Sequence, residues 1–144
     1  MKMNGNTELL NFIYQNSQMG VKTIDNLINV TDNENFKKHM EYQHNEYGKI
    51  NTRAKELLNK NGLKEKEISK FDRVKTKLMM EIETVKDNSV CHIAEMLIIG
   101  SNMGVINAIK NLKKYPNAEK EITDLMTDLK ILEESNAKEL QNYL

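Results

Sequence analysis

Apolar side chains recur every three or four residues along most of this chain, and this spacing constrains its fold more than any other feature. Residues three or four apart lie on one face of an α-helix, so each periodic segment predicts a helix that buries one side. Proline occurs once in 144 residues and tryptophan is absent, whereas Leu, Ile, Met, Glu and Lys are abundant. This composition is typical of an all-α protein.

Breaks between the periodic segments predict five helices, over residues 7–30, 33–61, 66–87 and 90–115, and a fifth that follows residue 117. The second is expected to stop at Gly62 and the fourth before Pro116, because glycine suits a helix C-terminus and proline cannot continue the hydrogen-bond ladder. The fourth is apolar over much of its circumference, which predicts a central position. The predicted N-caps are Thr7, Asp32 or Asn33, Ser89 and Asn117.

The length, the net charge and the distribution of apolar residues exclude several classes of protein. We expect a single domain over residues 1–144, because this length can bury enough surface to fold without a disulfide or a metal. Lys plus Arg and Asp plus Glu number 21 each, so no strong field draws the chain to nucleic acid or to a membrane. The first residues lack the apolar stretch of a secretory signal, and residues 90–110 are too polar for a lipid-facing span. A cytoplasmic location is the expectation.

The first and fourth predicted helices contain matching strings, SQMGV at residues 17–21 and SNMGV at residues 101–105. Residues 26–27 match residues 111–112 after a slip of one position. This internal repeat predicts that helices one and two form one antiparallel hairpin and helices four and five another, with helix three as the connector. The helices then run alternately up and down, and a pseudo-two-fold axis relates the two hairpins.

The chain resembles the ferritin-like four-helix bundles, in which a long crossover joins two helical hairpins; the predicted helix over 66–87 stands at that place. The string CHIAEMLIIGSNMG, residues 91–104, also resembles a group of small uncharacterised helical proteins from spore-forming anaerobic bacteria, over nearly the whole chain. The resemblance implies a ferritin-like antiparallel bundle. It implies no activity, because that group has no assigned function.

Glu41-x-x-His44, on the second predicted helix, is the strongest candidate for a metal-binding pair. Ferritin-like sites for two metal ions use such a pair from each of two helices and one Glu from each of the other two. The second pair is missing, since the fifth helix has no histidine, and the first helix offers only Glu8, near its start. The apolar stripe also turns Gln43 inward and Glu41 away.

We therefore expect Glu41 and His44 to be a solvated or partly buried pair without a cofactor. The alternative is a reduced site for iron or manganese, in which Glu95 or His92 completes the ligands. Cys91 precedes His92 in the first turn of the fourth helix, where a helix dipole can activate a thiol. Neighbours on a helix point about 100° apart, so we do not expect these two residues to act as a catalytic pair unless a further residue orients them.

Three glycines inside predicted helices, Gly20, Gly100 and Gly104, need an explanation, because glycine costs about 1 kcal/mol relative to alanine in a helix. Gly20 and Gly104 also share the same position of the repeat. We expect the first and fourth helices to cross closely at these glycines. A subunit contact or a small ligand pocket beside them is the alternative.

No glycine-rich phosphate loop, nucleophile elbow or Ser/His/Asp arrangement is visible in the sequence, which weakens an enzyme hypothesis without excluding one. The leading hypothesis is a non-catalytic ferritin-like bundle that acts by binding or self-association, as a homo-oligomer or with a protein partner that the sequence does not identify. The alternative is a metal-binding or metal-dependent oxidase relative that uses Glu41 and His44.

Overall fold

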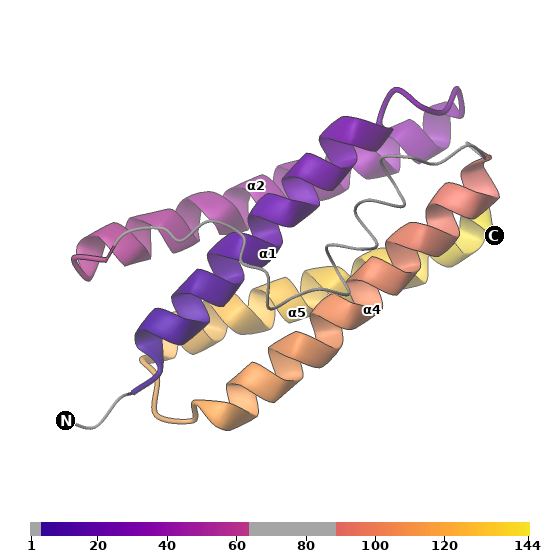
Figure 1. The fold of residues 1–144 in the computed structure, drawn as a ribbon. Helices are drawn as coiled ribbons and strands as arrows, with labels where there is room; N and C mark the ends of the chain where they lie inside the picture. The colour runs from indigo at the N-terminus through magenta and orange to yellow at the C-terminus, as the bar shows by residue number, and fades with distance from the viewer. Residues whose placement is uncertain (1–3, 64–88) are drawn as a thin grey trace.

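The computed structural model describes residues 4–63 and 89–144, and within them it contains four α-helices and no strand. The all-α prediction is therefore confirmed for the described residues (Figure 1). The predicted helix over 66–87 lies outside them. The helices are α1 (Asn6–Leu27), α2 (Glu34–Lys60), α4 (Val90–Lys114) and α5 (Lys120–Leu140), and a short 3-10 helix, η1 (Gln141–Tyr143), follows α5.

Two of the predicted N-caps are confirmed. The Asn33 side chain accepts a hydrogen bond from the backbone N–H of Phe36 at 2.9 Å and caps α2. The Ser89 side chain accepts one from the N–H of His92 at 3.2 Å and caps α4. Short polar side chains are good caps because they satisfy backbone donors that the first helical turn leaves unpaired.

The predicted caps Thr7 and Asn117 are wrong, because tertiary contacts set both helix starts. The N-cap of α1 is Gly5, whose φ of 85° is in the left-handed region. A Cβ there would lie 2.5 Å from Cβ and Cγ of Tyr115, so only glycine fits. The N-cap of α5 is Glu119, whose backbone N–H donates to Asn6 Oδ1 at 2.8 Å.

The helices pack as two tight hairpins, α1 with α2 and α4 with α5, and α5 also contacts α1 and α2 (Figure 1). The starts of α1 and α5 lie at the same end as the ends of α2 and α4, because Asn6 bonds to Glu119 and Lys60 pairs with Glu121. At the other end the rings of Phe36 and Tyr143 are 4.9 Å apart. It follows that α2 ends and α4 begins at opposite ends of the bundle.

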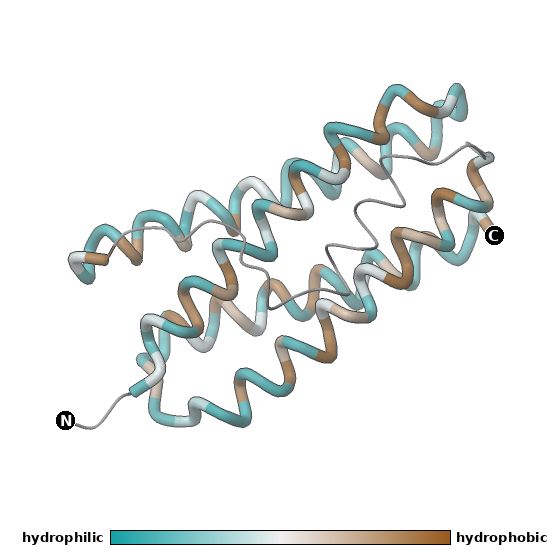
Figure 2. Tube along the Cα trace, viewed as in Figure 1, coloured by the Kyte–Doolittle hydropathy of each residue, from teal (hydrophilic) through white to brown (hydrophobic). Residues whose placement is uncertain are grey.

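The core lies between the hairpins, on the predicted apolar stripes (Figure 2). Helix α4 is less central than its composition predicts, because Ile99 and Ile106 are 46% and 52% exposed. The more enclosed helix is α1, which buries most of its residues, including Asn16 and Ser17. Their side chains donate to carbonyls one turn earlier, at 2.9 and 2.7 Å, and this back-bonding lets polar groups be buried.

Candidate functional site

The structure places Glu41 and His44 on the surface side of α2. Glu41 is exposed, and Gln43 points inward with 2% of its surface exposed, as the apolar stripe predicts. The half-buried ring of His44 has its Nε2 2.8 Å from Oδ1 of Asp25 on α1. His44 therefore forms a surface pair that joins α1 and α2, which is a structural contact of modest strength.

The other predicted metal ligands lie apart from this pair. Glu95 is exposed on α4, and His92 is half-buried in the first turn of that helix, beside the exposed Cys91. Within residues 4–63 and 89–144, no three His, Cys, Asp or Glu side chains form a group that could hold a metal ion. The described residues therefore supply no third ligand for Glu41 and His44, and a site for iron or manganese at these residues stays a prediction.

The polar centre of the bundle is formed by other side chains. Tyr47 on α2 donates its hydroxyl proton to Oε1 of Glu133 on α5, and this short hydrogen bond connects the two hairpins. Asn136 donates to the same tyrosine oxygen at 3.3 Å, and Ser101 on α4 also bonds to it. Tyr47 is 6% exposed, Glu133 3% and Asn136 0%, so water is excluded from this cluster. We call these four residues the central cluster.

Electrostatics keep the Tyr47 hydroxyl protonated. Burial, the negative charge of Glu133 and the hydrogen bond to that carboxylate raise the pKa of Tyr47 well above 10.0. A neutral phenol is the form that can donate to a carboxylate. Oδ1 of Asn136 has no hydrogen-bond partner among the described residues, so the cluster retains one buried acceptor.

The central cluster explains two of the three predicted glycines. A Cβ on Gly20 would lie 2.7 Å from Cγ of Tyr47, and a Cβ on Gly104 would overlap the carboxylate of Glu133 and lie 2.8 Å from its Cδ. Each glycine thus makes room for an inward side chain of the next helix in its own hairpin. The expected crossing of α1 with α4 at these glycines is wrong, because these two helices contact each other little. Gly100 is half-buried on α4.

The same packing removes the alternative of a ligand pocket beside the repeated glycines. The Tyr47 ring occupies the space beside Gly20, and Glu133 occupies the space beside Gly104. Sequence reasoning missed both side chains as members of one cluster. The usable signal was the glycine that the strings SQMGV and SNMGV share, which indicates a bulky inward residue opposite each.

Tyr47 belongs to a line of polar residues that follows the inner side of α2 at intervals of four. Gln43 Nε2 lies 2.7 Å from His39 Nε2, and because an amide nitrogen only donates, this ring nitrogen must accept. Burial lowers the pKa of His39, which agrees with a neutral ring, although the charge of Glu139 acts in the other direction. Further along, Asn51 donates to the Ser17 hydroxyl at 3.1 Å.

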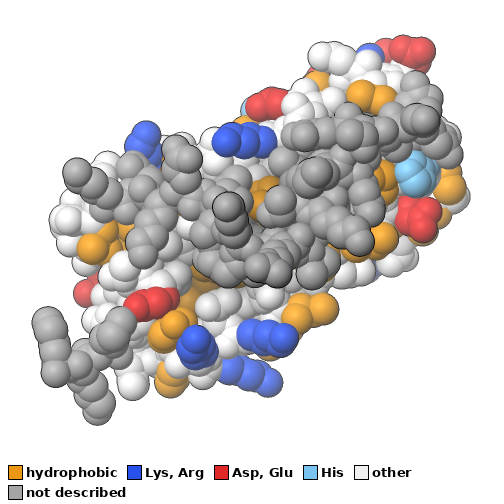
Figure 3. Space-filling model, viewed as in Figure 1, with side chains coloured by type: hydrophobic (Ala, Val, Ile, Leu, Met, Phe, Trp, Pro, Cys, Tyr) orange, Lys and Arg blue, Asp and Glu red, His pale blue; other side chains and the backbone are white. Residues whose placement is uncertain are grey.

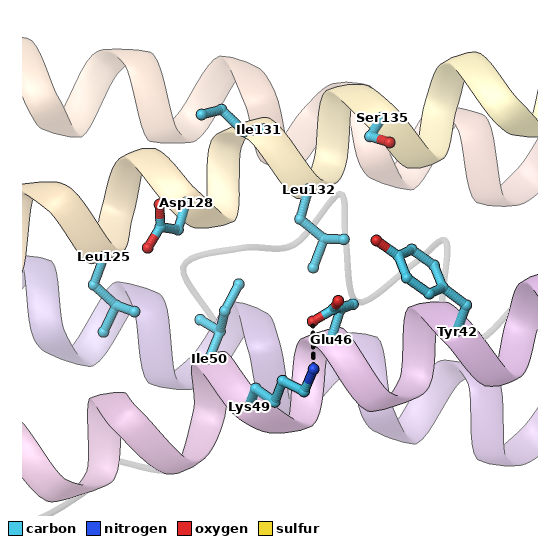
Figure 4. A pocket seen from close by; sticks show the side chains of 9 residues that line it. All are labelled: Tyr42, Glu46, Lys49, Ile50, Leu125, Asp128, Ile131, Leu132 and Ser135. Atoms are coloured by element: carbon cyan, nitrogen blue, oxygen red, sulfur yellow. Dashed lines mark ion pairs between the residues drawn. The ribbon is translucent and has the colours of Figure 1, made fainter.

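A groove of about 430 Å³ runs along the surface between α2 and α5 (Figure 4). Leu125 and Leu132 on α5 and Ile50 on α2 point toward one another at its floor. Tyr42 and Ile131 line it as well, and they are 53% and 56% exposed. Large exposed apolar side chains from two helices thus lie beside the same surface groove. Its polar lining residues are Glu46, Lys49, Asp128 and Ser135.

The rest of the described surface carries both signs of charge. On the face in Figure 3 basic side chains gather beside the end of α4, where Lys113 and Lys114 form the last turn. Among the described helices, α4 alone is long and apolar enough to cross a membrane by length and composition, with a mean hydropathy of 1.3 in its most apolar window. The core helix of a soluble protein passes the same test, and 33% of that window is buried.

Comparisons of the chain with protein-family models, with curated proteins and with solved structures find no match.

Proposed function

We propose that this chain is a non-catalytic, ferritin-like helical bundle that acts by binding or self-association. The observation that carries the proposal is the groove between α2 and α5, where Tyr42 and Ile131 are each more than half exposed beside an apolar floor. Exposed apolar side chains that adjoin one depression are typical of a protein-binding surface. Single exposed apolar residues elsewhere would need no such explanation.

The directions of the helices support a ferritin-like arrangement. Within each hairpin the helices are antiparallel, and α2 and α4 run in the same direction, so the end of α2 and the start of α4 lie at opposite ends of the bundle. Ferritin-like bundles share this order of helix directions, which a long crossover between their two hairpins makes possible. The two glycines support the internal repeat, since Gly20 faces Tyr47 and Gly104 faces Glu133 at corresponding places in the two hairpins.

The enclosure of the central cluster supports a non-catalytic role. Tyr47 and Glu133 are two titratable side chains in direct contact, yet both are almost fully buried and bonded to each other. A catalytic acid or base must come within hydrogen-bond reach of its substrate. The cluster instead fixes the two hairpins in one relative position, a role for which buried polar contacts are well suited.

Sedimentation equilibrium of the full chain over a range of protein concentrations tests self-association. We expect the average mass to rise from one chain toward a small oligomer as the concentration increases. A mass of one chain at all concentrations up to the millimolar range would contradict self-association, and the groove would then have to bind a different protein.

A further inference from the structure

We propose that the outward face of α4 docks on the surface of a lipid bilayer that contains anionic lipids. This inference goes beyond the proposed function, because the surface concerned lies on α4 and not in the groove between α2 and α5. Three features of α4 carry it: an exposed apolar strip, a basic end without acidic partners, and the distance between that end and the only acidic residue of the helix.

The apolar strip lies on the side of α4 that faces away from the core. Ile99 and Ile106 are 46% and 52% exposed, and a spacing of seven residues, about two helical turns, places them in one line along the helix. The exposed Asn102 lies between them, whereas Ala108, on the opposite side of the helix, is fully buried. We call Ile99, Asn102 and Ile106 the outer strip.

The absence of charge on an exposed surface distinguishes α4 from the other described helices. Residues 96–109, which contain the outer strip, include no Asp, Glu, Lys, Arg or His. Residues 9–21 of α1 are uncharged as well, but none of them is exposed. In α2 and α5 charged residues recur at least every five positions. An uncharged outer surface with two large exposed apolar side chains is typical of an interaction site.

The basic end of α4 indicates what the outer strip meets. Lys110, Lys113 and Lys114 follow Ile106 in the last turns of the helix, and basic side chains gather there (Figure 3). All three are exposed, and none makes an ion pair with a described residue. The Lys114 ammonium lies 5.4 Å from the centre of the Tyr115 ring. We call these three lysines the basic end.

The combination of the outer strip and the basic end favours a bilayer over other polyanions. Surface helices that bind anionic membranes present apolar side chains to the acyl boundary and lysines to the lipid phosphates. A nucleic acid would neutralise the lysines and leave the two isoleucines in water. A bilayer surface covers both parts of α4 at once, because the headgroups adjoin the apolar interior.

The balanced charge of the whole chain does not oppose this contact. Glu95, the only acidic residue of α4, precedes Lys110 by about 22 Å along the helix, at a rise of about 1.5 Å per residue. Electrostatic forces between exposed charges are screened beyond about 8 Å at physiological salt. An anionic surface therefore attracts the basic end, although the sum of the charges predicts no attraction. We expect the basic end to lie nearer the bilayer and Ile106 to enter it.

The first test measures co-sedimentation of the full chain with vesicles. We expect binding to vesicles of phosphatidylcholine and phosphatidylglycerol in equal parts, little binding to phosphatidylcholine alone, and a loss of binding as salt is added. The triple variant Lys110→Gln, Lys113→Gln, Lys114→Gln should bind the anionic vesicles on the order of a hundredfold more weakly, because each lysine near the surface contributes about fivefold.

The matched control for the lysines is the triple variant Lys38→Gln, Lys49→Gln, Lys138→Gln. These lysines are exposed on α2 and α5, so the control has the same net charge as the first variant and retains the basic end. It should bind the anionic vesicles like the wild type. Circular dichroism of each variant shows whether the helices are retained.

The second test places a fluorescent reporter in the outer strip. The chain contains no tryptophan, so Ile106→Trp introduces a single indole, and Ile131→Trp is the matched control because Ile131 is 56% exposed on α5. On addition of anionic vesicles the emission of Ile106→Trp should shift to shorter wavelength, since the indole leaves water, and that of Ile131→Trp should not. Ile106→Ser should weaken vesicle binding about tenfold, and Ile131→Ser should leave it unchanged.

Four outcomes would overturn the proposal. The first is a wild-type chain that stays in solution with anionic vesicles, and the second is binding that both triple variants lose equally or both retain. The third is bound protein in which the Ile106→Trp emission does not shift, which shows that the outer strip stays in water. The fourth is retention on immobilised heparin without binding to vesicles, which would assign the basic end to a soluble polyanion. A monomeric wild type would contradict the proposed self-association and leave this inference standing.

Discussion

Replacing Gly20 by alanine should destabilise the protein, although alanine is the better helix former. In the middle of α1 the substitution removes the backbone cost of glycine and would by itself gain about 1 kcal/mol. The added Cβ, however, would lie 2.7 to 2.8 Å from three atoms of the Tyr47 ring. That ring is rigid, 6% exposed and bonded to Glu133, so it cannot move into solvent without leaving its partner.

The magnitude follows from the two penalties. Overpacking a core of this kind costs about 1 to 3 kcal/mol, and loss of the hydrogen bond to a buried carboxylate costs about 1 to 3 kcal/mol more. After the gain in helix propensity, we expect the free energy of unfolding to fall by about 1 to 5 kcal/mol. Equilibrium unfolding in urea, followed by circular dichroism, measures this change.

Gly48→Ala is the matched control, because Gly48 adjoins Tyr47 on α2 but has no neighbour within 4 Å of its Cβ position. It should raise the free energy of unfolding of the monomer by about 1 kcal/mol and the melting temperature by about 2 to 5 °C. In a Tyr47→Ala background the cost of Gly20→Ala should disappear. A Gly20→Ala protein as stable as the wild type, or a cost that persists without the tyrosine ring, would refute the reasoning.

Three further predictions concern the central cluster and the candidate metal ligands. Gly104→Ala should also lower the free energy of unfolding, by about 1 to 4 kcal/mol in urea titrations, because its Cβ would displace the buried carboxylate; a gain in stability would contradict this packing. Tyr47→Phe should cost about 1 to 3 kcal/mol at pH 7 through the lost donor. Because the raised pKa of Tyr47 lets the folded protein keep a proton that the unfolded chain releases above about pH 10, wild-type stability should fall as the pH rises past this value. Thermal melts of the wild type and of Tyr47→Phe from pH 8 to 11 measure this fall in stability. The variant should lack the part of the fall that Tyr47 causes, and the same slope of melting temperature against pH in both proteins would contradict the prediction. Elemental analysis after incubation with ferrous, manganese or zinc ions should find no stoichiometric metal; metal retained by the wild type and lost in Glu41→Ala/His44→Ala would reverse that expectation.

The helical class of the described residues and several of the helix ends are determined by local sequence. Apolar spacing of three and four residues places the buried face of each described helix, because a helix repeats every 3.6 residues wherever it forms. Asn33 and Ser89 cap their helices through bonds to N–H groups three residues later, and Pro116 lies just beyond the end of α4. These are local interactions, so a single sequence is enough to predict them.

The starts of α1 and α5 and the members of the central cluster were decided by tertiary structure. Gly5 caps α1 because Tyr115 packs against it, and Asn6 helps to set the start of α5, yet these contacts join residues far apart in the chain. The pairing of Tyr47 with Glu133 likewise depends on how the two hairpins are placed against each other.

The sequence by itself determined that Gly20 and Gly104 stand at the same place in two matching strings, SQMGV and SNMGV, but it did not determine what these glycines face. Periodicity specifies which side of a helix is buried and not which neighbour covers it. Only the packed bundle shows Gly20 against Tyr47 of α2 and Gly104 against Glu133 of α5. The physical reason is that a buried polar contact between helices needs three-dimensional proximity, which depends on all the packed helices together and not on any one segment.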